Sequence, residues 1–105
     1  MLAAAEALDV ATDAFDAGAP DATEAAHRAA LLSAKAKIIA DDFAIRGGGL
    51  LFDVGGASAT KKATNFDRHW RNARTLSSHN PTTYKARSIE QHVISGTPLP
   101  AKGFF

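Results

Sequence analysis

Apolar positions in the first part of the chain follow the spacing of helix faces. Residues 1–17 place apolar or small side chains alternately four and three positions apart, at Met1, Ala5, Leu8, Thr12 and Phe15. This spacing predicts a helix whose inward face carries those side chains. Gly18 is a natural stop for this helix. Asp21, followed three residues later by Glu24, forms a capping-box pattern that predicts the start of a second helix.

The second predicted helix is long and is interrupted in composition by three glycines. Its stripe of apolar or small residues comprises Ala25, Ala29, Leu32, Ala36, Ile39, Phe43, Gly47, Leu50 and Val54. Residues 47–49 are all glycine, and each costs a helix about 1 kcal/mol relative to alanine. Because the stripe resumes in register after the glycines, we expect the helix to continue to about residue 54, with close packing compensating for their cost.

A third helix is expected after a loop at residues 55–64, which is assigned by its composition. Thr64 and Asp67 have the spacing of a capping box and predict its start. We expect the helix to end near His79 and to turn four positions inward, namely Phe66, Trp70, Ala73 and Leu76 or Ser77.

The fourth helix is predicted from an Asn-Pro break. Asn80 precedes a proline and is therefore pushed out of the α region, while asparagine is a good N-cap and Pro81 suits the first helical position. An apolar stripe follows at Thr82, Ala86, Ile89 and Val93, and Gly96 ends the helix. The pattern thus predicts an all-α domain of four helices over residues 1–95, with an extended tail over residues 96–105.

The apolar content is high in number but low in bulk. Hydrophobic residues make up 46% of the 105-residue chain, but 23 of them are alanine. Alanine favours helix, yet it buries little surface compared with leucine or phenylalanine. We therefore expect a thin core and a domain that associates with a second copy or with other domains.

Composition also bears on compartment and membrane contact. The chain has no cysteine, which fits a reducing cytoplasm. The N-terminal stretch lacks a basic segment, and no apolar run approaches the roughly 20 residues of a membrane span. A cytoplasmic protein without a membrane partner is therefore expected.

The charges are distributed unevenly. Residues 1–60 carry nine acidic and four basic side chains, and residues 61–105 carry eight basic and two acidic ones. The basic half could face phosphate, nucleic acid or the acidic half of another copy, or it could be a solvated face. A nucleic-acid partner is not expected, since Trp70 is assigned to the core instead of lying beside the arginines. No metal site is expected, because no two histidines have the four-residue spacing of helical metal motifs.

Two places could carry chemistry. His79 is expected at a helix C-terminus, where the macrodipole favours a cation, directly before the N–H end of the next helix, which favours an anion. A solvated or capping histidine is the open alternative. The turn Gly55, Gly56, Ala57 and Ser58 exposes backbone N–H groups near two lysines and could cradle an anion, although a plain loop is equally consistent with its composition.

The segment "FDRHWRNARTLSSHNPTTYKARSIEQHVISG", residues 66–96, resembles the C-terminal end of flavin-dependent monooxygenases of the dibenzothiophene-monooxygenase type, a branch of the acyl-CoA dehydrogenase superfamily. "LLFDVGGASAT", residues 50–60, resembles the stretch that precedes it. The resemblance covers nearly all of this chain but only the last quarter or so of a family member. It implies that residues 1–95 form an up-and-down four-helix bundle, the family's C-terminal domain, without the family's N-terminal and middle domains.

The resemblance also implies roles for individual residues. Asn80 stands where the dehydrogenases often have a glutamate base, and an amide cannot act as that base. A histidine in this turn resembles the monooxygenase branch, in which a reduced flavin reacts with oxygen, and implies that His79 is catalytic. Asn80 and the four residues Gly55, Gly56, Ala57 and Ser58 are implied as flavin contacts, the latter four reaching the phosphate end across a subunit interface.

The partners implied by the resemblance are FMN, with FAD as the alternative, a flavin reductase that supplies reduced FMN, and further copies of the chain in a homo-oligomer. The isolated domain is expected to be inactive. Three alternatives remain open: an acyl-CoA dehydrogenase-like oxidoreductase domain, a non-enzymatic self-associating helical module, and a small basic nucleic-acid binder.

Overall fold

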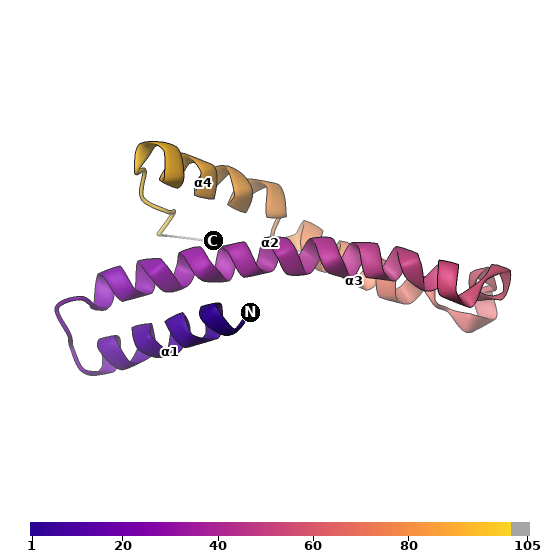
Figure 1. Ribbon diagram of the computed structural model, residues 1–105, viewed down its shortest axis with the longest axis horizontal. Coiled ribbons are helices and arrows are strands. Elements are labelled where there is room, and N and C mark those ends of the chain that lie inside the picture. Colours follow the sequence, from indigo (N-terminus) through magenta and orange to yellow (C-terminus); the bar gives the residue numbers. More distant parts are fainter. Residues whose placement is uncertain (102–105) are drawn as a thin grey trace. The chain divides into compact units, whose positions relative to one another are not determined.

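The computed structural model describes residues 1–101, and its regular structure is entirely helical (Figure 1). The described part of the chain forms α1 (Leu2–Asp16), α2 (Ala22–Gly55), α3 (Asp67–His79) and α4 (Thr82–Ser95), with short 3₁₀ turns at Ala57–Thr60 and Lys62–Thr64. The predicted all-α class is therefore confirmed. The last four residues of the predicted tail, 102–105, lie outside the described residues.

The chain divides into two compact units. One unit comprises Met1–Ile38 together with Thr83–Phe105, and the other comprises Ile39–Thr82. Helix α2 runs through both units. Its first part contributes to the first unit, and its second part packs with α3 in the second.

In the first unit, α1 runs antiparallel beside the first part of α2 (Figure 1). Gly18, with φ of 61°, ends α1 as predicted, and α2 begins directly after Asp21. The backbone N–H of Ala25 donates to the carbonyl oxygen of Asp21 at 2.9 Å, which closes the first helical turn. The local start and stop signals in this part of the sequence were therefore interpreted correctly.

The inward face predicted for α1 is wrong. Its buried residues are Ala4 and Ala7, while Leu8 and Phe15 are 50% and 77% exposed. Small side chains let two helix axes approach closely, because the distance between axes depends on the side chains at the contact. The alanine face of α1 therefore lies inside the unit, and its larger apolar side chains remain on the surface.

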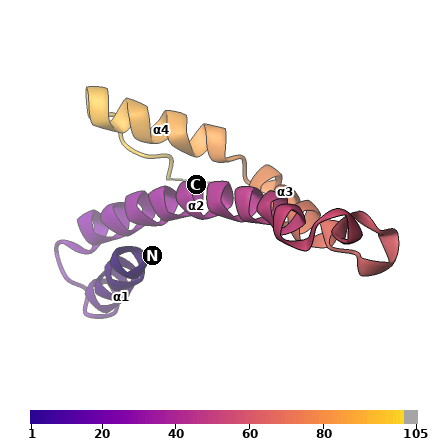
Figure 2. The ribbon, with the colours of Figure 1, turned by 45° about the vertical axis from the view of Figure 1, so that its right-hand side comes forward.

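Helix α4 lies along the first part of α2 (Figure 2), and the inward face predicted for it is also partly wrong. Ala86 and Val93 are exposed, whereas Lys85 is buried and His92 is half-buried. Ser88 and Ile89, which lie between Lys85 and His92 along the helix, are also half-buried. The face turned inward is therefore more polar than the apolar stripe that the sequence suggested.

In the second unit, the three glycines lie within a continuous helix, as predicted. A Cβ atom added to Gly48 would lie 3.0 Å from the Cα atom of Trp70 and 3.2 Å from its backbone nitrogen, whereas one on Gly47 or Gly49 would meet nothing within 4 Å. The backbone of α3 therefore packs directly on α2 at Gly48. This close contact is the compensation that the sequence analysis expected.

The second part of α2 does not turn its predicted stripe inward. Ile39, Phe43, Leu50 and Val54 are 57%, 67%, 60% and 87% exposed. The buried or half-buried residues are instead Ile45, Gly48, Leu51 and Phe52. Helix α3 is too short and too polar to cover more than one side of α2, so the four exposed residues form a continuous apolar strip, here called the α2 strip.

The predicted inward face of α3 is confirmed only in part. Ser77 is buried and Phe66 and Ala73 are half-buried, but Leu76 is 69% exposed. Trp70, expected in the core, packs through its backbone while 42% of the residue remains exposed. Its indole is therefore available at the surface of α3.

Candidate functional site

The turn Gly55–Ser58 follows the end of α2 and is shaped by glycine. A Cβ atom on Gly55 would lie 2.6 Å from the Cβ atom of Ala59, so a larger residue there would displace the following 3₁₀ turn. Gly56 has φ of 59° and ψ of −164°, a conformation that favours glycine. Ala59 is buried, whereas all four residues of the turn are exposed. The fold therefore presents the backbone of this turn to the surface.

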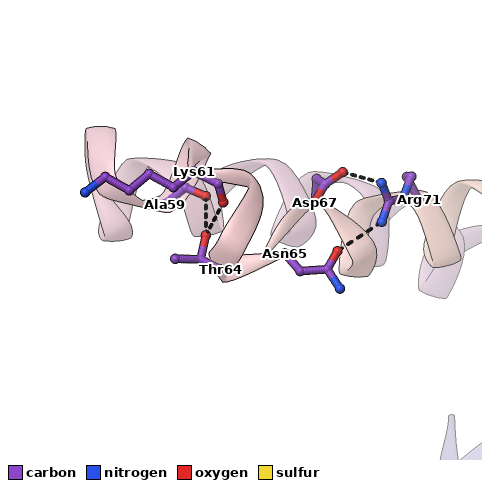
Figure 3. A network of polar contacts seen from close by, with 6 residues as sticks. All are labelled: Ala59, Lys61, Thr64, Asn65, Asp67 and Arg71. Atoms are coloured by element: carbon purple, nitrogen blue, oxygen red, sulfur yellow. Dashed lines mark hydrogen bonds and ion pairs between the residues drawn. The ribbon is translucent and has the colours of Figure 1, made fainter.

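The segment between α2 and α3, here called the connector, is held in its second half by side-chain hydrogen bonds (Figure 3). The hydroxyl of Thr64 donates to the carbonyl oxygens of Ala59 at 3.0 Å and Lys61 at 2.7 Å. Thr64 is thus not the N-cap of α3, as had been predicted. That position belongs to Phe66, whose side chain has no acceptor for a capping bond.

Arg71 ties the connector to the first turn of α3. Its guanidinium donates to Asp67 Oδ2 at 2.5 Å and to Asn65 Oδ1 at 3.1 Å, from two different nitrogens (Figure 3). Asn65 has φ of 50°, a left-handed conformation that asparagine tolerates better than most residues. Asp67 and Arg71 thus form an ion pair one helical turn apart, and the guanidinium orders the turn.

His79 is the last residue of α3, where the sequence analysis expected the helix to end. Asn80 has φ of −127° and ψ of 88°, outside the α region, as its place before a proline requires. The fourth helix begins at Thr82, one residue later than expected, so Pro81 precedes the helix. The hydroxyl of Thr82 donates to Asp41 Oδ2 at 2.6 Å, which ties the residue after the Asn-Pro break to α2.

An open groove runs along one face of α3 and ends at His79. Its lining consists of Trp70, Arg71, Arg74, Thr75, Ser78 and His79. The groove combines an indole, two guanidinium groups, two hydroxyl groups and an imidazole. Guanidinium groups bind anions through paired N–H donors, and an indole stacks on planar rings. The groove therefore combines a surface for stacking with donors for an anion, although the Arg71 guanidinium is already bonded to Asp67 and Asn65.

The two candidate places lie at opposite ends of α3. The ring of Phe66, just before α3, lies 3.5 Å from a Cβ atom built on Gly55, whereas His79 ends the helix. Helix α3 has 13 residues. At 1.5 Å per residue it spans about 20 Å. Within one copy the structure brings His79 together with Asn80, but not with the turn at 55–58.

Within residues 1–101, no helix is both long and apolar enough to cross a membrane. Groups of three or more side chains that could hold a metal ion are also not found there.

Comparison with known proteins places this helical chain in a family. Residues 1–84 match the model of the acyl-CoA dehydrogenase C-terminal domain. The chain belongs to this family. It is 35% identical over 101 residues to dibenzothiophene monooxygenase from Rhodococcus erythropolis, which covers 93% of this chain and 24% of that protein. The dibenzothiophene monooxygenase from Mycolicibacterium goodii gives the same identity and coverage.

A third relative is the probable FMNH2-dependent monooxygenase SfnC from Pseudomonas putida. It is 40% identical over 55 residues, which are 52% of this chain and 14% of that protein. No solved structure gives a significant match. The chain spans about a quarter of the length of the two dibenzothiophene monooxygenases. The family resemblance noted in the sequence is therefore confirmed.

The sequence analysis missed a contact in the first unit. His27 on α2 and His92 on α4 pack edge to face, with ring centroids 4.9 Å apart. They are 65 positions apart in the sequence, so no local pattern links them. Only the packing of α4 on α2 brings them together.

Proposed function

We propose that this chain is the C-terminal helical domain of a flavin-dependent monooxygenase that uses reduced FMN from a separate flavin reductase. The similarity to two dibenzothiophene monooxygenases and to a probable FMNH2-dependent monooxygenase carries this proposal. FAD is the alternative flavin. The N-terminal and middle domains of the family complete the protein, and the domain alone is inactive.

His79 is the proposed catalytic residue. When bound, reduced FMN supplies the electrons that activate oxygen. An imidazole can hold or deliver a proton near neutral pH. The Asn-Pro break and the bond between Thr82 and Asp41 keep the residue at the end of the groove. The amide of Asn80 can contact a cofactor but cannot remove a proton from carbon, which disfavours the alternative of an acyl-CoA dehydrogenase.

The turn Gly55, Gly56, Ala57 and Ser58 is the proposed contact for the flavin phosphate. Its exposed backbone and the neighbouring exposed side chains of Lys61 and Lys62 suit an anion. Because about 20 Å of α3 separates this turn from His79, we propose that the two places serve different flavins of an oligomer. The turn of one copy then reaches the flavin whose ring lies near the partner's histidine.

Subunit association is supported by the exposed apolar surface. Large apolar side chains are exposed on α1, on α4 and along the α2 strip. The same surface favours the second candidate, a helical module that only self-associates. The two candidates differ in flavin binding, since the module has no need of it.

Replacement of His79 by alanine tests the catalytic role in the polypeptide that joins this chain to the remaining domains. We expect the His79→Ala variant to lose oxygenation with supplied reduced FMN by about 10²- to 10⁴-fold, the usual contribution of a positioned acid or base. The exposed His69, on the same helix, provides the matched control, and His69→Ala should retain activity. Circular dichroism should show unchanged helix content in both variants.

An active His79→Ala variant would contradict the catalytic assignment.

Titration of the same polypeptide with reduced and oxidised FMN tests the wider proposal. If neither form binds while the protein still associates in sedimentation experiments, the self-associating module is the better description.

A further inference from the structure

The residues that follow α4 fold back onto the first unit and are held there by two histidines. Gly96, with φ of 69°, reverses the chain after the helix. The carbonyl oxygen of Thr97 lies 3.0 Å from His92 Nδ1, and the backbone N–H of Leu99 donates to His27 Nε2 at 3.3 Å. Leu99 is only 6% exposed, so this short segment contributes one of the buried apolar residues of its unit.

The bond from Leu99 defines the protonation state of His27. A ring nitrogen accepts a hydrogen bond only through a free lone pair, so Nε2 must carry no proton and the ring must be neutral. When the ring takes up a proton, both nitrogens become donors, and the N–H of Leu99 then faces another N–H. The docked position of Leu99 is therefore compatible with the neutral form of His27 and incompatible with its cationic form.

His92 responds differently to protonation. Its Nδ1 faces a carbonyl oxygen, so it donates in the docked state, and a protonated ring can still make that bond. The two rings are nevertheless packed with centroids 4.9 Å apart and planes inclined by 62°. Two positive rings at this distance repel each other, which adds to the loss of the acceptor on His27.

His27 has ionisable neighbours on its own helix and on α4. On α2 its neighbours in sequence with charge are Glu24 and Arg28, which line the cavity of about 450 Å³ between α1 and α2, together with Glu6 from α1. From α4 the contacting ionisable group is His92. Residues 97–101 contain no ionisable side chain. The acidic and basic side chains at the cavity are thus separate from the bond to the tail.

We infer that residues 97–99 form a pH-sensitive clasp, docked while His27 is neutral and released when His27 takes up a proton. Release exposes Leu99 and frees the C-terminal segment from α2 and α4. This inference is independent of flavin binding.

Amide exchange and NMR spectroscopy of the 105-residue chain test the clasp. We expect the protection factor of the Leu99 amide to fall about fivefold or more between pH 8 and pH 5, as the loss of one hydrogen bond implies. The midpoint should coincide with the protonation of the His27 ring, followed in the same samples through its carbon-bound ring protons. A Leu99 amide that keeps its protection down to pH 5, or loses it at a pH unrelated to His27, would overturn the inference.

A substitution separates the acceptor from the titration. His27→Gln keeps a hydrogen-bond acceptor near the position of Nε2 but does not take up a proton, so the pH dependence of Leu99 protection should disappear. His69→Gln, on α3 in the other unit, is the matched control and should behave like the unaltered chain. A His27→Gln chain with the original pH dependence would refute the clasp. If that variant loses helix content, the wild-type midpoint comparison decides alone.

Discussion

Gly48 and Trp70 show how a single missing side chain sets the contact between two helices. The backbone of Trp70 comes within 3.0 Å of the position where a Cβ atom on Gly48 would stand. Because backbone atoms cannot move aside as a flexible side chain can, the contact requires glycine. The glycines on either side face open space, so their cost in helix propensity is not offset by any packing.

Alanine substitutions at these glycines should therefore have opposite effects on stability. We expect Gly48→Ala to lower the free energy of unfolding by about 1–3 kcal/mol, because the added methyl group overpacks the contact. Gly47→Ala and Gly49→Ala should raise it by up to about 1 kcal/mol each through helix propensity. Urea unfolding followed by circular dichroism measures all three. Equal effects at the three positions would show that α3 does not rest on Gly48.

At the scale of an element, the connector between α2 and α3 is a short ordered segment and not a plain loop. Two 3₁₀ turns, the hydroxyl of Thr64 and the guanidinium of Arg71 satisfy its polar groups. The Asp67 and Arg71 side chains are 50% and 56% exposed, so the ion pair alone contributes about 0–1 kcal/mol. The larger effect of Arg71 is geometric, since one planar group orients two residues.

Replacing Arg71 by lysine should loosen this connector while keeping the charge. A lysine ammonium is a point charge without the planar fork, so it cannot hold Asn65 and Asp67 in the same way. We expect a loss of about 0.5–1 kcal/mol in unfolding free energy and faster amide exchange at residues 61–66. Arg68→Lys is the control, because Arg68 makes only a 3.4 Å contact with the neighbouring His69. Identical exchange in the two variants would show that the Arg71 guanidinium does not order the connector.

At the scale of the whole molecule, the folded chain leaves much of its large apolar surface uncovered. The buried apolar residues are mainly alanines, while phenylalanine, leucine and valine side chains remain exposed on α1 and along the α2 strip. Exposed apolar surface of this kind marks sites of association. The expectation of a thin core that needs neighbours therefore agrees with the observed burial.

The α2 strip should contribute to self-association. Phe43→Glu combined with Leu50→Glu removes two exposed apolar side chains and adds charge, and burial of such side chains contributes about 1.5–3 kcal/mol each. We expect the association constant from sedimentation equilibrium to fall by at least about tenfold. Ala44→Glu, an exposed position beside the strip, provides the control for added charge. Unchanged association in the double variant would exclude the α2 strip from the interface.

The amino-acid sequence by itself determined the all-α class and most helix ends, because these depend on local chemistry. Gly18 and Gly96 stop helices through left-handed backbone conformations, and the Asn80-Pro81 bond forces a break after His79. The family was also accessible from the sequence, since residues 66–96 carry its motif. The catalytic and flavin-contact assignments stay predictions that rest on that motif.

Only the tertiary structure decided which side of each helix is covered. The apolar stripes of α1 and of the second part of α2 pointed to the wrong faces. On α1 the packing selects small residues that let helices approach. On α2 the backbone contact at Gly48 fixes the covered face, which carries Ile45, Leu51 and Phe52. The contact of His27 with His92 likewise depends on how helices pack. Contacts between residues far apart in the chain leave no periodic signal, so only the three-dimensional arrangement of the helices could reveal them.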